Sequence, residues 1–124
     1  MAIQVLIVDD HAVLRAGLRM LLDAEPDIEV IGEAQNGATA IQMVENNPPD
    51  VVVLDINMPG KDGIETLNDI VSERGSLPVI LHTAYSAYKD NYMTWSAVEY
   101  VVKSAAGGFK ELKEAVAKAV STSE

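Results

Sequence analysis

The stretch VVVLDINMPGKDGIE, residues 51–65, contains the pattern that decides the fold. Its first four residues are apolar and mostly β-branched, which is typical of a strand buried on both faces. Asp55 ends this run, and a loop rich in glycine and proline follows it. Ile64, Leu67 and Ile70 then recur at helical spacing. The stretch therefore predicts a strand, a loop and a helix in succession.

The same unit recurs along the whole chain, because short apolar runs alternate with helical patterns. The predicted strands are Ile3–Val8, Ile28–Ile31, Val51–Leu54, Pro78–Leu81 and Tyr100–Val102. The predicted helices are centred on residues 14–22, 40–44, 64–71, 84–95 and 112–120. Buried strands that alternate with helices predict an α/β fold, a doubly wound parallel sheet that helices cover on both faces.

The composition predicts one acidic domain, residues 1–124, with no effector module. Hydrophobic residues make up 48% of the chain but aromatic residues only 5%, so the core should be aliphatic. A net charge of -10 argues against direct nucleic-acid binding, and the absence of cysteine excludes disulfides and thiolate metal sites. No apolar run approaches ~18 residues, so no membrane span is expected. Met1 leads directly into the first strand, and we expect a cytoplasmic protein without a signal peptide.

Polar residues follow four of the predicted strands at the point where each strand ends. Asp9 and Asp10 follow the first strand, Asp55 the third, Thr83 the fourth and Lys103 the fifth. In an open parallel sheet, ligands bind beyond the carboxyl ends of the strands. If the first and third strands are neighbours, the three carboxylates repel one another, and Mg²⁺, or Mn²⁺ in its place, would relieve that repulsion. Asp55 could then act as a nucleophile toward phosphorus, with a hydroxyl and an ammonium group to hold the phosphoryl oxygens.

Each of these residues also has an ordinary structural interpretation. The pair Asp9-Asp10 could cap the first helix, and Asp55 could begin a turn. Thr83 could be a strand residue of good β propensity, and Lys103 a solvated surface lysine. The joint placement of all of them at strand ends favours a site.

Two histidines, His11 and His82, are candidates for carrying a phosphoryl group. Exposed positions in a loop and a strand are the favoured interpretation of both. No ligand spacing typical of zinc sites joins the two residues.

The chain resembles the response-regulator receiver family over its whole length. The segment VLIVDDHAVLRAGLRMLL, residues 5–22, is similar to receivers that precede a LuxR-type DNA-binding module, and residues 51–65 are similar to the family's phosphoacceptor segment. The resemblance implies a flavodoxin-like, five-stranded parallel sheet in the order 2-1-3-4-5 with about five helices. It also implies a signalling switch of a two-component phosphorelay and not an enzyme with a separate substrate. Its donor would be a sensor histidine kinase, its output partner is unidentified, and a homodimer could form upon phosphorylation.

The resemblance assigns the phosphoryl and metal chemistry to residues of this chain. Asp55 is the phosphoacceptor and a metal ligand. Asp10 binds Mg²⁺ directly, Asp9 acts through water, and Asn57 offers its backbone carbonyl to the metal. Lys103 pairs with the phosphoryl group.

The resemblance also implies a conformational switch. Thr83 moves to meet the phosphoryl group, Ala84 leaves room for it, and Tyr100 turns inward when Thr83 moves. A strand tyrosine with its hydroxyl in water is the alternative interpretation of Tyr100. Asn57 and Tyr85 flank the site and would set the access to the phosphoryl group and its lifetime.

The segment between the fourth and fifth strands departs from the family pattern. The span from Thr83 to Lys103 is short, and Ser96-Ala97 stands where a Gly-Ala step is usual. Ser104 stands where many receivers have proline, and we expect a trans peptide bond there because a cis bond without proline costs about 3 kcal/mol. The helix and the output face in this segment are therefore the least transferable part of the resemblance.

Three other functions compete with the phosphorelay switch. A Mg²⁺-dependent phosphatase of the haloacid-dehalogenase type also uses an aspartate at a strand end, but its motif separates two acids by one residue, whereas Asp9 and Asp10 are adjacent. A receiver that only binds partners would not need the complete set of site residues. A flavin mononucleotide binder would need a glycine- and hydroxyl-rich phosphate cradle in the first loop, which the sequence lacks.

Overall fold

The computed structural model describes residues 2–54, 69, 70, 72, 77–83, 98–102 and 112–118, and of residues 81–83 and 98–102 it describes the backbone alone. The strands are β1 (Ile3–Val8), β2 (Ile28–Ala34), β3 (Val51–Leu54), β4 (Val79–Thr83) and β5 (Val98–Val102). The complete helices are α1 (Ala12–Asp23) and α2 (Gly37–Asn46), and residues 112–118 are also helical. The predicted helix at 84–95 and the peptide bond before Ser104 lie outside the described residues.

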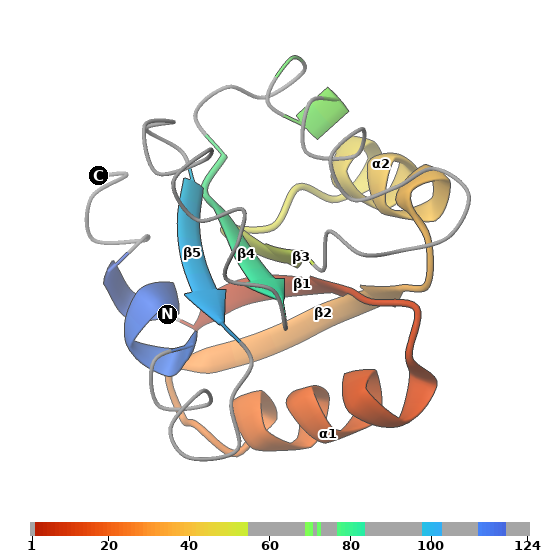
Figure 1. Ribbon diagram of the computed structural model, residues 1–124. Coiled ribbons are helices and arrows are strands. Elements are labelled where there is room, and N and C mark those ends of the chain that lie inside the picture. The colour runs from red at the N-terminus through yellow and green to blue at the C-terminus, as the bar shows by residue number, and fades with distance from the viewer. Residues whose placement is uncertain are drawn as a thin grey trace.

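All five strands are parallel and lie in the order β2-β1-β3-β4-β5, as Figure 1 shows. This order confirms the flavodoxin-like sheet that the family resemblance implies. The order reverses at β1 and β3, since the chain first adds a strand on one side of β1 and then adds the rest on the other side. In such sheets the ligand site lies beyond the carboxyl ends of the strands at this reversal.

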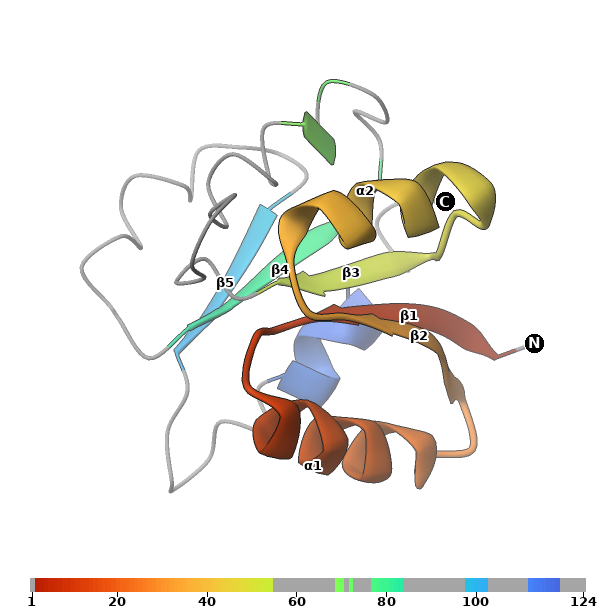
Figure 2. The ribbon, with the colours of Figure 1, turned by 90° about the vertical axis from the view of Figure 1, so that its right-hand side faces the viewer.

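Helices cover both faces of the sheet, with α2 on one face and α1 and helix 112–118 on the other (Figure 2). The side chains of β1 and β3 alternate between the two faces, as strand geometry requires. The core on the α2 side includes Leu6, Val8, Ala40, Val44, Val52, Leu54 and Val79. The core on the α1 side includes Val5, Ile7, Leu18, Leu22, Val51, Val53, Ile80, Leu112 and Val116. The described part of each core is aliphatic, and because the side chain of every aromatic residue lies outside the described part, the wholly aliphatic core stays a prediction.

Within the described ranges, no helix is long and apolar enough to cross a membrane.

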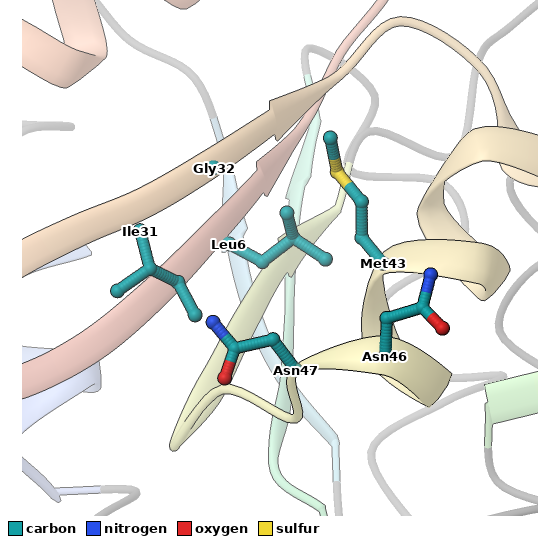
Figure 3. A pocket seen from close by; sticks show the side chains of 6 residues that line it. All are labelled: Leu6, Ile31, Gly32, Met43, Asn46 and Asn47. Atoms are coloured by element: carbon teal, nitrogen blue, oxygen red, sulfur yellow. The ribbon is translucent and has the colours of Figure 1, made fainter.

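The pairing of β1 with β2 contains one irregularity. Val5 pairs with Val30 but Leu6 pairs with Gly32, so Ile31 is an extra residue on β2. Beside it lies a pocket of about 150 Å³ between β2 and α2, lined by Leu6, Ile31, Gly32, Met43, Asn46 and Asn47 (Figure 3). Gly32, which has no side chain, forms part of the wall of this pocket.

We predict that Gly32→Ala stabilises the protein. A Cβ at this position would lie 3.4 Å from Leu6 Cδ1 and 3.6 Å from Met43 Sδ, which is ordinary van der Waals contact. The substitution also lowers the entropy of the unfolded chain, and together these effects should raise the free energy of unfolding by about 0.5–1 kcal/mol. Urea titration of both proteins measures the change. Gly32→Val serves as the control, because its extra methyl groups must enter the same space and should cancel the gain; a Gly32→Ala protein less stable than the wild type would contradict the prediction.

Candidate functional site

The carboxyl ends of the strands meet along one edge of the sheet. Val8, the last residue of β1, pairs with Leu54, the last residue of β3, and Leu54 pairs with Leu81 of β4. Thr83 and Val102, the last residues of β4 and β5, pair with each other. The acidic pair that follows Val8 therefore stands at this edge, between the ends of β2 and β3.

Asp9 is held in place through its backbone and its side chain. Its N–H donates to the carbonyl of Ala34 over 3.1 Å, and its own carbonyl accepts from Arg15 Nη1 over 2.6 Å. Its Oδ1 accepts from the N–H of His11 over 2.9 Å. With 2% of its surface exposed, Asp9 is the one buried polar residue in the described part of the chain. The fold thus fixes a carboxylate at the sheet edge at the cost of removing it from water.

Asp10 contains a buried carboxylate oxygen without a hydrogen-bond donor. The side chain is 24% exposed, but Oδ1 is buried and makes no hydrogen bond within the described residues. His11 Nδ1 lies 3.1 Å from this oxygen, close enough for an ion pair but without the direction of a hydrogen bond. A buried carboxylate oxygen is costly unless a donor or a cation satisfies it.

His11 is the residue that caps α1, which makes the helix-capping interpretation of Asp9-Asp10 wrong. His11 takes the N-cap position with an extended backbone and no side-chain capping bond. The bond described for Asp9 Oδ1 comes from the N–H of His11 itself, which precedes the helix and is not one of the free N–H groups of the first turn.

The imidazole of His11 lies beside both carboxylates, with Nδ1 3.3 Å from Asp9 Oδ1 and 3.1 Å from Asp10 Oδ1. The ligand atoms of all three residues lie within 4.8 Å of one another. The sequence interpretation of His11 as an exposed loop residue is correct for its ring, which is 66% exposed, but it missed this proximity. The available signal was its place directly after two acids, where a short loop turns into a helix.

Two arginines of α1 tie the helix to the end of β2. Arg15 Nε donates to Glu33 over 3.2 Å while its Nη1 holds the Asp9 carbonyl. Arg19 Nη1 donates to the other oxygen of Glu33 over 2.7 Å and lies near Asp23. The hydrogen bond to Glu33 is the main cause that raises the pKa of Arg19. The position of Asp9 therefore depends on a charged network that spans β1, α1 and β2.

We predict that Arg15→Met destabilises the protein more than Arg19→Met. Arg15 is 16% exposed and bonds to a backbone carbonyl as well as to Glu33, so its loss should lower the free energy of unfolding by about 1–3 kcal/mol. Arg19 is 45% exposed and pairs only with carboxylates in the described part, so its loss should cost less than about 1 kcal/mol. Denaturant unfolding of the two variants gives the comparison. Equal losses would contradict a special role of the bond to Asp9.

The acidic pair offers the ligand atoms that a hard cation prefers. Both residues offer carboxylate oxygens, which Mg²⁺ prefers, and Asp10 has one buried oxygen that no described hydrogen bond satisfies. A divalent ion would also remove the repulsion between the two carboxylates. The residues present therefore fit the ion that the sequence predicts.

The remaining predicted site residues fall outside this geometry. The structure gives the backbone of Thr83 at the end of β4 and of Tyr100 within β5, but not their side chains. The predicted residues outside the described ranges are Asp55, Asn57, Ala84, Tyr85 and Lys103. His82 lies in β4, with only its backbone described.

Comparisons with known proteins identify the family. The family model for the response regulator receiver domain matches residues 5–117. The chain is 34% identical over 118 residues to the transcriptional regulatory protein DegU of Brevibacillus brevis, a match that covers 95% of this chain and 47% of DegU. The chain spans about half or less of the length of the first curated relatives that it matches.

Solved structures give the same result. A LuxR-family response regulator from Aurantimonas sp. superposes with a TM-score of 0.89 at 29% identity, covering 98% of this chain and 87% of that one. The response regulator TrrA of Thermotoga maritima, solved in complex with Mg²⁺ and BeF, superposes with a TM-score of 0.82 at 39% identity, covering 96% and 99%. With the sheet order, the acidic pair at the sheet edge and these matches, the chain belongs to the response regulator receiver domain family of two-component systems.

Proposed function

We propose that this domain is a phosphoacceptor switch, in which Asp55 accepts a phosphoryl group from a phosphohistidine of a sensor kinase in the presence of Mg²⁺. The observation that carries the proposal is the pair Asp9 and Asp10, fixed beside the end of β3 with a buried oxygen that lacks a donor. The proposal treats residues 1–124 as one cytoplasmic receiver domain, and the family match over residues 5–117 supports that extent.

The register of β1 and β3 supports a place for Asp55 near the acidic pair. Val8 and Leu54 are paired, and Asp9 and Asp55 are the residues that follow them. Adjacent Cα atoms are about 3.8 Å apart and neighbouring strands about 4.8 Å apart, so the chain leaves Asp55 little room to lie far away. The three carboxylates would then share one volume, as the proposed chemistry requires.

The register of β4 and β5 supports roles for Thr83 and Lys103. Thr83 pairs with Val102 at the sheet edge, and Lys103 is the next residue of the chain. A hydroxyl and an ammonium group that arrive from two neighbouring strands could hold two oxygens of a phosphoryl group.

The proposed reaction transfers one phosphoryl group to this chain. A carboxylate oxygen of Asp55 forms a bond to phosphorus as the bond from phosphorus to the donor nitrogen breaks, and the imidazole of the donor leaves. Asp9, Asp10, Asp55 and the carbonyl of Asn57 would hold the metal, which when bound offsets the negative charge of the carboxylates and of the phosphoryl group. The complex of the TrrA relative with Mg²⁺ and BeF supports this metal.

The output of the switch is a change in the face that binds partners. The added charge of about -1.5 to -2 would draw in Thr83 and Lys103, and Tyr100 would turn inward as Thr83 moves. Ala84 would leave room for this movement, and Asn57 and Tyr85 would set the lifetime of the phosphoryl group. A bias of about 1–3 kcal/mol changes the affinity for an output partner, or for a second copy, by about 5–150-fold.

Intact mass spectrometry tests the proposal. The chain is incubated with a small acyl phosphate, with and without Mg²⁺, and the mass of one added phosphoryl group is sought. We expect the adduct only with Mg²⁺. A chain that stays unlabelled under both conditions would favour a receiver that only binds partners. Steady turnover of a generic phosphate ester would favour the phosphatase, against which the family match already argues.

A further inference from the structure

We propose that His11 converts the acidic pair into a mixed nitrogen and oxygen site that takes Zn²⁺ in preference to Mg²⁺. The inference rests on the proposed function, because it gives zinc the role of a competitor at the metal site of the switch. It concerns a residue to which the proposed phosphoryl chemistry assigns no part.

The first support is the spacing of the three ligand atoms. His11 Nδ1 lies 3.3 Å from Asp9 Oδ1 and 3.1 Å from Asp10 Oδ1. Ligands that bind zinc at about 2.0–2.2 Å, separated by angles between an octahedral and a tetrahedral value, lie about 3.0–3.5 Å from one another. The two measured distances, which are also those of the ion pairs of His11 with the two carboxylates, fall within this range, so His11 Nδ1 lies at the spacing that neighbouring ligands of a single ion require.

The second support is the state of the two carboxylates. Asp9 is 2% exposed and its backbone is fixed at both its N–H and its carbonyl. Asp10 Oδ1 is buried, and no hydrogen bond within the described residues satisfies it. The imidazole of His11 lies close to Asp10 Oδ1 but does not form a hydrogen bond to it. An ion bound between His11 Nδ1 and the two carboxylates would satisfy this buried oxygen.

The ligand types decide which ion gains from His11. Imidazole suits zinc, copper and nickel, whereas Mg²⁺ prefers oxygen ligands and retains water molecules. Adding His11 to the two carboxylates therefore strengthens zinc binding and adds little to magnesium binding. Zinc usually takes four ligands and magnesium six, so zinc with His11 added to the carboxylates would leave less room for a phosphoryl oxygen than magnesium does.

The exposure of the ring lets one site serve both ions. The side chain of His11 is 66% exposed, and in the described part its only side-chain partners are the two carboxylates. The ring can therefore bind zinc when zinc is present and turn into water when the site holds magnesium. Neither position requires much rearrangement of the backbone at Asp9.

Isothermal titration calorimetry of the whole chain tests the inference, with Zn²⁺ and Mg²⁺ titrated separately into the wild type, His11→Gln and His82→Gln. We expect His11→Gln to lower the ratio of zinc affinity to magnesium affinity by about 10–100-fold. His82→Gln is the matched control, since it removes the other histidine of the chain, and it should keep the wild-type ratio. Nitrogen-15 NMR of the wild type gives a readout without substitution, because zinc and not magnesium should shift the Nδ1 resonance of His11.

The outcomes separate this inference from the proposed function. An unchanged ratio in His11→Gln, or an equal fall in His82→Gln, would overturn the role of His11. If the wild type still takes a phosphoryl group with Mg²⁺ in that case, the proposed function stands and only the zinc site is lost. The opposite result is that zinc binding depends on His11 but the chain takes no phosphoryl group with Mg²⁺. In that case the zinc site stands and the proposed switch is overturned.

Discussion

Asp55→Asn is expected to abolish phosphoryl labelling of the chain by an acyl phosphate with Mg²⁺. The asparagine amide is not an ionised carboxylate, so it cannot form the mixed anhydride that the proposed reaction requires. No other residue combines a carboxylate with the proposed place beside Asp9 and Asp10 at the end of β3. Intact mass spectrometry should show the wild type with one added phosphoryl group and the variant with none.

A matched variant keeps this test specific. Asp50→Asn removes one negative charge at the other end of β3, where Asp50 accepts a hydrogen bond from the N–H of Gln4 over 2.8 Å. It should be labelled as the wild type is. Undiminished labelling of Asp55→Asn would show that the phosphoryl group is attached elsewhere and would overturn the assignment.

Asp10→Asn is expected to weaken Mg²⁺ binding and at the same time to stabilise the metal-free protein. The variant loses a charged ligand of the metal. Removing a residue that only supports a metal ligand already lowers metal affinity by about 10–100-fold, so the Mg²⁺ affinity of this variant should fall by at least that much. Without metal, however, the variant also loses the repulsion between two adjacent carboxylates and the cost of a partly buried charge. The free energy of unfolding should therefore rise by about 1 kcal/mol.

Calorimetric Mg²⁺ titration and urea unfolding with a chelator measure the two effects. Asp27→Asn is the control, because Asp27 is an exposed acid that precedes β2 at the opposite edge of the sheet. It changes the net charge by the same amount and should alter neither quantity by much. A loss of stability in metal-free Asp10→Asn would mean that the carboxylate serves the fold and would argue against a site kept for a cation.

The strands that the sequence predicts best are those whose pattern has no competing signal. Val51–Leu54 is β3 in both its bounds, since a fully apolar run lies between Pro48-Pro49-Asp50 and Asp55. The first strand, Ile3–Val8, is also correct in both bounds. The sheet order came from the family resemblance, because apolar patterns do not say which strands are neighbours.

The predicted end of the second strand was wrong. The prediction stopped at Ile31, whereas β2 continues to Ala34. The apolar run ends before Gly32 and Glu33, and glycine and glutamate are unfavourable in strands. The structure accommodates Glu33 there, since Arg15 and Arg19 pair with it across from α1. Such compensation between distant residues leaves no local trace in the sequence.

The edges of β4 and β5 were also predicted imperfectly. The fourth strand was predicted at Pro78–Leu81 and lies at Val79–Thr83, because Pro78 lacks an N–H and contributes only its carbonyl, which accepts from Val52. The fifth begins at Val98, two residues before the predicted Tyr100.

The site was predictable where it depends on the ends of strands, and less so where it depends on a side-chain conformation. Asp9 and Asp10 stand at the sheet edge as predicted, since both follow directly from the end of β1. The approach of His11 to them depends on where α1 begins and on the rotamer of one exposed ring. Neither is encoded in an apolar pattern.

The position of β1 has a mechanical consequence for the site. This strand lies between β2 and β3, and its alternate side chains belong to the two separate cores, Leu6 and Val8 to one and Val5 and Ile7 to the other. Peeling a helix from either face would leave β1 anchored by the opposite core and by both flanking strands, so its amides should be among the last to exchange with solvent. Asp9 extends this strand by one further bond to β2. The two aspartates therefore directly follow a strand that two cores and two flanking strands hold, which should keep them at fixed positions.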